Sequence, residues 1–473
     1  MTICGEIAEW ATGLRTADIP AAALGRGRLQ AASIRAARAA GEEDAAPFAV
    51  AAADGPVGEI YRSAVASIAH DWDDYLFMGH TGHSAVPAAA AFCGDSERAL
   101  VAQIAANEVA GRLGAALFLG PHNGQFWASI HCASAATAAA LGLGLDGART
   151  AHALAIALYQ PPYGMWPGFM GPKSKLLTAA EPAATGARAA LLAAEGVTGA
   201  LDVIEHPRGL LANLSFAPQP SMLDGLGRVW LTETLAFKRL PGCAYLQAAA
   251  EAACAAAVDP GEVAAVDVDG GWLTCGMEQL GGGQELTPVR VNFSTALSVA
   301  IALLCGRLTP AELKPAWLAE NAERIRSLAA CVRVRHDPAL TACTLRGTLD
   351  AGASPADVSL RDWLRVRRRL GESGMDEVNP GPALLRALAA DRGARASLLR
   401  SLRGRLGRAR RKGLDGLDTR ALRMTFPCRL RISLQDGTVR ELEGGEPGSC
   451  GRPLEEQRNV VEEKLRVAGI AGA

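Results

Sequence analysis

The chain has 473 residues, of which 49% are hydrophobic and 21% charged, both within the usual range of globular proteins. This length suffices for two or three domains with a large core, and a formal net charge of −1 gives no general attraction to nucleic acid or acidic membranes. No apolar run is long and clean enough to span a bilayer, so we expect neither nucleic acid nor a membrane as a partner.

The cysteines and the first residues indicate a reducing compartment. Among the 11 Cys, we expect Cys93, Cys254 and Cys305 to be buried, because they lie in apolar helical patterns, and no CxxC pair occurs. The segment MTICGEIAEW lacks the basic and then apolar pattern of a signal peptide. We therefore predict a cytoplasmic protein without structural disulfides.

From about residue 3 to 255 the pattern predicts helix after helix, separated by short Gly/Pro breaks. Apolar residues recur at spacings of three and four, and many segments are apolar nearly all round, which is typical of a buried multi-helix core. Another helix is expected to begin at Pro87, in an alanine-rich run. The clearest helical segments are 58–70, 97–116, 132–141, 148–158, 181–195 and 244–257.

The pattern changes near residue 258. Residues 262–277 and 331–337 alternate like strands, and 423–444 predicts a hairpin that turns at Asp436-Gly437. The helices expected in this half of the chain are 293–304, 310–328, an arginine-rich piece at about 358–415 and a polar helix at 453–467.

These patterns predict a mainly α protein with a smaller α+β domain. The large all-helical domain would span 1–255 and be joined by a C-terminal helix at 450–473, and the α+β domain would span 256–449. We interpret the arginines of 401–413 as a solvated helix face, because no aromatic residues are interleaved to stack bases and the chain is neutral.

The segment 70–87 (HDWDDYLFMGHTGHSAVP) is the best candidate for an active site. We expect its acids at the end of one helix and its histidines in a loop entering the next. An Asp/His pair can supply both the acid and the base for proton transfer beside a carbonyl or carboxylate. Helix capping and ordinary loop histidines are the alternative. The segment combines three carboxylates with two of the 8 His: Asp71, Asp73, Asp74, His80 and His83.

A metal hydrolase using His70, Asp71, Asp74 and His80 is a further alternative, since His70-Asp71 resembles the HD pair of metal phosphohydrolases. That class needs upstream and downstream partners that the sequence does not place, and the Asp run lacks the DDxxD spacing of isoprenoid synthases. We therefore predict no metal.

Two basic segments suit an anionic ligand. Lys173 and Lys175 precede a helix rich in small residues, and a helix N-terminus favours negative charge. Lys238 and Arg239 precede a Pro-Gly turn where the two patterns join, and ligand clefts often form between domains. The alternatives are a solvated lysine pair and interdomain salt bridging.

Taken in order, these segments resemble the MmgE/PrpD family. Part of the resemblance lies in the segment 70–87, called the acidic loop from here on, and in the two lysine segments. It also rests on GVTGALDVIE, FKRLPGC, VNFSTALSVAIALLCGRLT and the hairpin with its following helix. It implies a large helical domain, a smaller α+β lid domain, a cleft between them and a homodimer. It also implies cofactor-free chemistry on small organic acids, such as methylcitrate dehydration, cis-aconitate decarboxylation or iminodisuccinate epimerisation.

By this resemblance Asp71 and His80 match the catalytic Asp and His of the family. Lys175 matches a lysine that meets the substrate carboxylate, and Lys238 matches the lysine of an FKRYP-like segment. The other expected substrate contacts are Tyr75, His83, Lys173, Arg239, Gln125 and His131.

The chain also departs from the family pattern. Tyr75 replaces a Thr in a loop that is one residue shorter, Gly124-Gln125-Phe126 replaces Gly-Trp-His, Gln247 replaces a His, and Leu297 falls where a Tyr is expected. His131 lies near the missing His. The retained Asp, His and Lys residues would sit in a more apolar pocket, which suggests a less acidic substrate.

We therefore predict a lyase or isomerase that acts without a cofactor beside a carboxylate or carbonyl, with dehydration ahead of decarboxylation or epimerisation. His80 would be the acid or base with Asp71 as its partner, and Lys175 and Lys238 would hold the anionic group of the substrate. A diverged, non-catalytic binding protein is the alternative.

Overall fold

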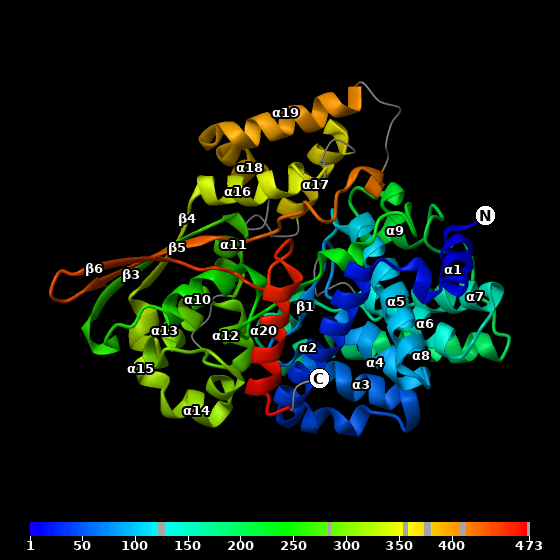
Figure 1. Ribbon diagram of the computed structural model, residues 1–473, viewed down its shortest axis with the longest axis horizontal. Coiled ribbons are helices and arrows are strands. Elements are labelled where there is room, and N and C mark those ends of the chain that lie inside the picture. Colours follow the sequence, from blue (N-terminus) through cyan, green and yellow to red (C-terminus); the bar gives the residue numbers. More distant parts are fainter. Residues whose placement is uncertain (122–127, 282–284, 353–357, 373–379, 407–412, 471–473) are drawn as a thin grey trace.

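The computed structural model describes residues 1–121, 128–281, 285–352, 358–372, 380–406 and 413–470, and it is mainly helical with one small mixed sheet (Figure 1). The predicted fold class is therefore confirmed. No helix within these ranges is both long and apolar enough to cross a membrane.

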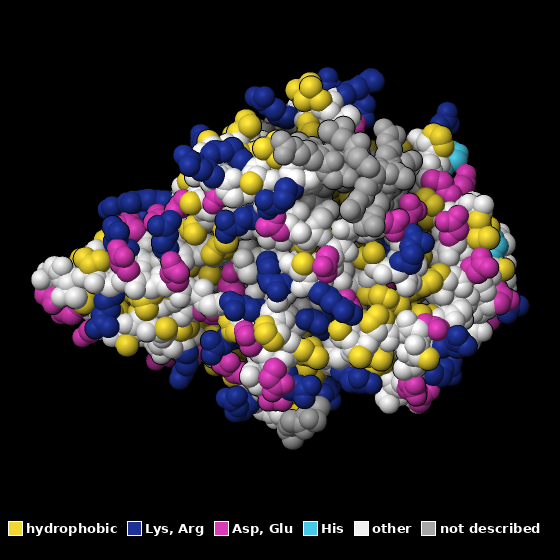
Figure 2. Space-filling model, turned by 45° about the horizontal axis from the view of Figure 1, so that its top comes forward, with side chains coloured by type: hydrophobic (Ala, Val, Ile, Leu, Met, Phe, Trp, Pro, Cys, Tyr) yellow, Lys and Arg dark blue, Asp and Glu magenta, His cyan; other side chains and the backbone are white. Residues whose placement is uncertain are grey.

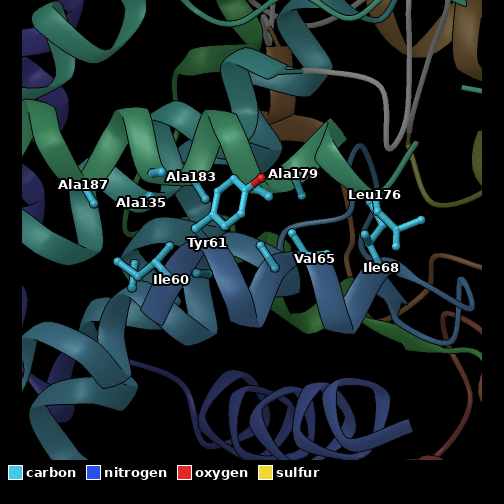
Figure 3. Packing of buried hydrophobic residues seen from close by; sticks show 14 of the residues in the cluster. Ile60, Tyr61, Val65, Ile68, Ala135, Leu176, Ala179, Ala183 and Ala187 are labelled. Carbon is cyan, nitrogen blue, oxygen red and sulfur yellow. The ribbon is translucent and has the colours of Figure 1, made fainter. Parts of the chain in front are cut away.

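The helical part, residues 1–254, is a stack of alanine-rich helices around α6 and α8. Small side chains let the backbones approach closely: a Cβ on Gly186 of α8 would lie 2.2 Å from the Cys132 carbonyl oxygen of α6. Larger side chains of α3, such as Ile60 and Val65, pack against this alanine surface (Figure 3). The helices are α1 (Ile3–Gly13), α2 (Ala21–Ala45), α3 (Gly55–Ile68), α4 (Gly82–Phe92), α5 (Ser96–Leu117), α6 (Ala128–Gly142), α7 (Gly147–Tyr159), α8 (Leu177–Ala194), α9 (Leu210–Leu214) and α10 (Gln247–Cys254).

The sheet part, residues 263–443, is built on four strands in the order β4-β3-β5-β6. β3 (Val263–Gly270) runs parallel to β4 (Val332–His336) and antiparallel to β5 (Cys428–Leu434), which pairs with β6 (Val439–Glu443). Its apolar core joins the inner face of β3 and β5 to α10 and α13. The helices are α11 (Trp272–Gly281), α12 (Pro288–Phe293), α13 (Thr295–Cys305), α14 (Pro315–Glu320), α15 (Ala322–Ala330), α16 (Pro338–Leu349), α17 (Leu360–Glu372), α18 (Pro380–Ala390) and α19 (Arg392–Leu406).

Most predicted elements are found, including the hairpin at Asp436-Gly437 and the strand at 331–337, but four details were wrong. α4 begins at Gly82 rather than Pro87, so Pro87 lies inside a helix. The strand predicted over 262–277 ends at Gly270, where α11 follows. The helix predicted over 310–328 is divided into a short turn, α14 and α15. Finally, Cys93, Cys254 and Cys305 are half-buried.

The arginine side chains of α17 are exposed. Arg368 and Arg369 of α17 pair with Glu372 on the same helix. Figure 2 shows basic and acidic side chains interspersed over the face of the molecule that it presents. The arginines of 401–413, interpreted from the sequence as a solvated face, lie mostly outside the residues whose side chains the structure describes, so that interpretation stays a prediction.

Two small elements join segments that are distant in the chain. β1 (Asp74–Tyr75) pairs antiparallel with β2 (Ala236–Phe237), and the C-terminal helix α20 (Leu454–Val467) packs against α2. β1 is part of the acidic loop, residues 70–87, and α20 lies near β1 (Figure 1). The division into domains near residue 255 stays a prediction.

Candidate active site

The acidic loop starts where α3 ends, and its backbone is fixed by contacts to the segment around residue 238. Asp71 adopts the left-handed conformation, with φ 50°, which is uncommon for a residue other than glycine. The β1–β2 pairing then brings Asp73 opposite Lys238, whose backbone N–H donates to the Asp73 carbonyl at 3.2 Å. Two segments more than 160 residues apart are thereby placed side by side.

Asp73 is the centre of the site. Its Oδ2 lies 2.6 Å from His80 Nδ1 and 3.0 Å from His83 Nε2, and its Oδ1 accepts from Lys238 Nζ at 2.5 Å. Burial alone would raise the pKa of Asp73, but Lys238 and the two histidines hold it well below its usual value. Asp73 is therefore an anion at neutral pH.

His80 is the histidine of this cluster that reaches the surface. Its side chain is 16% exposed, whereas that of His83 is fully buried. Nδ1 faces Asp73, and Nε2 has no hydrogen-bond partner among the described residues. Because an anionic Asp73 favours a proton on Nδ1, Nε2 carries the lone pair and is available to a ligand.

A second buried pair, Lys175 and Asp71, lies next to the Asp73 cluster. Lys175 Nζ donates to Asp71 Oδ1 at 2.5 Å and to the Ile68 carbonyl at 3.1 Å, and it lies 5.3 Å from the ring centre of Phe293 on α12. Burial lowers the pKa of Lys175 despite its partner, whereas Lys175 and Lys238 lower the pKa of Asp71 against the effect of burial. The expected Asp71–His80 pairing is therefore wrong: Asp71 is engaged by Lys175, and Asp73 faces His80.

His83 and His131 form the wall behind Asp73. Both are fully buried, with ring centres 6.3 Å apart. His83 Nδ1 lies 2.8 Å from the Ser67 hydroxyl, and His131 Nδ1 lies 3.1 Å from the Ser84 hydroxyl. Burial lowers the pKa of His83, although Asp73 acts in the opposite direction. The neutral ring of His83 thus orients the carboxylate of Asp73.

The other predicted site residues vary in their distance from the Asp73–His80 pair. Tyr75 is buried with its ring centre 6.0 Å from that of His80. Arg239 donates to Glu463 of α20 at 2.9 Å, a salt bridge between the predicted helical domain and the C-terminal helix that joins it rather than one between domains, and Lys173 lies at the surface 3.6 Å from Asp44. Gln125 falls outside the described residues, as do Gly124 and Phe126.

Gln247 and Leu297, the two remaining departures from the family pattern, make contacts that stabilise the fold of this chain. Gln247 accepts from the backbone N–H of Leu240 at 3.0 Å and donates to the Leu240 carbonyl at 2.9 Å. Leu297 is half-buried in the apolar core of the sheet part. These positions therefore support the fold rather than supply polar groups to the site.

Asp74 and Lys464 are fully buried, and only Asp74 was among the site residues expected from the sequence. Asp74 Oδ2 accepts from Gln30 Nε2 at 2.7 Å, and its Oδ1 has no partner among the described residues. Lys464 of α20 donates to the Ser33 hydroxyl at 2.6 Å and to the Trp72 carbonyl at 2.7 Å. Burial raises the pKa of Asp74 to about 7, helped by Asp73, and burial lowers the pKa of Lys464 to about 7.

Asp74 is expected to make the protein less stable as the pH rises from about 4 to about 7. Its folded pKa of about 7 exceeds its usual 3.8, so the folded state binds more protons in this window and the free energy of unfolding falls by up to about 1.4 kcal/mol per pH unit. Urea unfolding at pH 5 and pH 7.5 measures this loss. An Asp74→Asn variant should show a smaller loss, and an equal loss in both proteins would contradict the assignment.

The histidine and acid side chains of the loop do not converge as the metal-hydrolase alternative requires. His70 Nε2 points to Asp44 at 3.0 Å, rather than to Asp74 or His80. Within the described ranges, no group of three or more His, Cys, Asp or Glu is placed to hold a metal ion.

Comparison with known proteins adds one finding. Residues 60–223 match the model of the MmgE/PrpD N-terminal domain. This segment includes the acidic loop, both buried histidines and Lys175, and it ends before Lys238. No curated protein matches the chain.

Proposed function

The chain belongs to the MmgE/PrpD family through the domain at residues 60–223, and on this premise we propose that it is a cofactor-independent lyase or isomerase. Its substrate would be a small organic acid, which loses a proton from the carbon beside a carboxylate or carbonyl. Dehydration is the first reaction to test, followed by decarboxylation and epimerisation. We further propose that it acts as a cytoplasmic homodimer, an assembly that light scattering can measure.

The observation that carries this proposal is the Asp73–His80 pair. Asp73 Oδ2 lies 2.6 Å from His80 Nδ1, and His80 Nε2 is open. His80 would remove the proton with Nε2, and the resulting imidazolium would be stabilised by the Asp73 anion. In a dehydration the same Nε2–H would then protonate the departing hydroxyl, so that water leaves and the carbon–carbon double bond forms.

The two lysines support this chemistry by their charge. Burial lowers the pKa of Lys238, but Asp73 and Asp71 together raise it, so Lys238 stays protonated. Lys175 and Lys238 balance the two aspartates, so the site can accept a further negative charge without a large repulsion. Negative charge that develops on an enolate would be stabilised by these fixed cations.

Proton NMR in D₂O with a panel of hydroxy- and unsaturated mono-, di- and tricarboxylates tests the proposal. We expect deuterium incorporation or alkene formation with at least one acid, and a loss of roughly 100-fold or more in His80→Gln, because a general base contributes about 10²–10⁴-fold.

His206→Gln is the matched control, since the His206 side chain is exposed and its Nδ1 accepts from the Arg208 backbone N–H at 3.1 Å. Equal rates in both variants would contradict the role of His80. Binding of acids without any exchange would favour the non-catalytic alternative.

A further inference from the structure

A cavity of about 660 Å³ lies between the helical part and the sheet part. Asp44, Lys173 and Leu176 line it on the helical side, and Val289, Leu318 and Arg326 line it on the other side. None of the residues of the Asp73–His80 cluster lines this cavity. It is therefore a separate space, although Lys173 shares a short helix (Lys173–Leu176) with the buried Lys175.

Two cations, Lys173 and Arg326, line this cavity from opposite sides, and their acidic partners among the described residues lie 3.5 Å or more away. Lys173 Nζ lies 3.6 Å from Asp44 Oδ1, and the Asp44 carboxylate is held more closely by His70 at 3.0 Å. Arg326 lies 3.5 Å from Glu323, whose side chain is 94% exposed. Both pairs are long, and the lysine and arginine side chains are themselves about half exposed, so both cations keep donors for a ligand. Glu285, which also lines the cavity, is exposed.

The rest of the lining is largely apolar. Ala69 and Leu176 on one side face a set of Pro, Val, Leu and Ala side chains on the other. The volume is within the range of about 300–1,000 Å³ that is typical of small-molecule sites, which combine apolar walls with a few polar groups. A ligand for this cavity needs an anionic end and an apolar body.

We infer that this cavity binds a small monocarboxylic acid with an aliphatic body, whose carboxylate lies between Lys173 and Arg326. The inference does not depend on the proposed reaction, because it uses neither Asp73 nor His80. Both walls would contact the ligand, so binding would also join the helical part to the sheet part.

Isothermal titration calorimetry of the full chain with hexanoate tests this inference, with hexan-1-ol and hexylammonium as neutral and cationic probes of the same length. We expect hexanoate to bind at least about tenfold more tightly than either probe, because charge-assisted hydrogen bonds need its carboxylate. Lys173→Met and Arg326→Met should each weaken hexanoate about tenfold, and Ala322→Trp, which fills the cavity, should abolish binding.

Arg324→Met is the matched control, because Arg324 is exposed on the same helix and does not line the cavity. Its affinity for hexanoate should equal that of the wild type. Absence of hexanoate binding would overturn the inference. So would equal affinities in Arg326→Met and Arg324→Met, or binding that is lost in His80→Gln while it persists in Ala322→Trp.

Discussion

An Asp73→Asn variant is expected to lose proton-transfer activity by roughly 10³-fold or more and to unfold more readily than the wild type. An amide cannot stabilise the imidazolium of His80, and it can bind the ring in the wrong tautomer, an effect that costs about 10⁴-fold in an Asp–His pair of this kind. The change also leaves the Lys238 ammonium buried without its carboxylate, now 2.5 Å away, which costs roughly 3–5 kcal/mol.

Deuterium exchange by NMR and urea unfolding together check this prediction. A double variant, Asp73→Asn with Lys238→Met, removes both charges and should recover most of the stability, while activity stays lost. Normal exchange in Asp73→Asn would show that His80 does not depend on this carboxylate. Full activity in the double variant would exclude the whole cluster from the reaction.

Helix and strand periodicity predicted most of the fold, and its failures have local physical causes. The helix expected from Pro87 begins at Gly82 instead, where any Cβ would lie 2.0 Å from Asp74 Oδ1, so the glycine allows the first turn of α4 to pack against the acidic loop. The strand prediction over 262–277 ran too far because alternation continues into the first turn of α11, after Gly270.

The sequence located the acidic loop but not the pairs within it. Which of Asp71 and Asp73 faces His80 depends on the register of β1 against β2, two strands of only two residues each. Such a register is set by long-range packing and leaves no local signal. The left-handed turn at Asp71 likewise cannot be read from a non-glycine residue.

Lys464 had a detectable signal that was overlooked. It is one turn after Val460 and Val461 and next to Leu465, so it lies on the buried stripe of a helix that reads as polar overall. A lysine on such a stripe predicts a buried amine. The Lys464 ammonium donates to the Ser33 hydroxyl and the Trp72 carbonyl, and the second of these bonds joins the C-terminal helix to the acidic loop.

The two fully buried lysines Lys175 and Lys464 are expected to differ in how much stability their replacement by methionine costs. Lys175 neutralises Asp71 at 2.5 Å, so Lys175→Met leaves a buried anion in a left-handed turn and should cost roughly 3–5 kcal/mol. Lys464 bonds a hydroxyl and a carbonyl rather than a carboxylate, so Lys464→Met should lie within about 1 kcal/mol of the wild type at pH 7 or exceed it.

The pH dependence separates these two cases further. Burial lowers the pKa of Lys464 from 10.5 to about 7, so between these values the unfolded state binds more protons and the wild type gains stability as the pH rises. The stability of Lys464→Met relative to the wild type should therefore be highest at or below pH 7 and decline by pH 9. Urea unfolding at both pH values measures it. Equal destabilisation by the two substitutions would show that the contacts of Lys464 stabilise the protein by more than its burial costs. For Lys175, the control is a Lys175→Met/Asp71→Asn double variant, which should recover the stability that Lys175→Met loses.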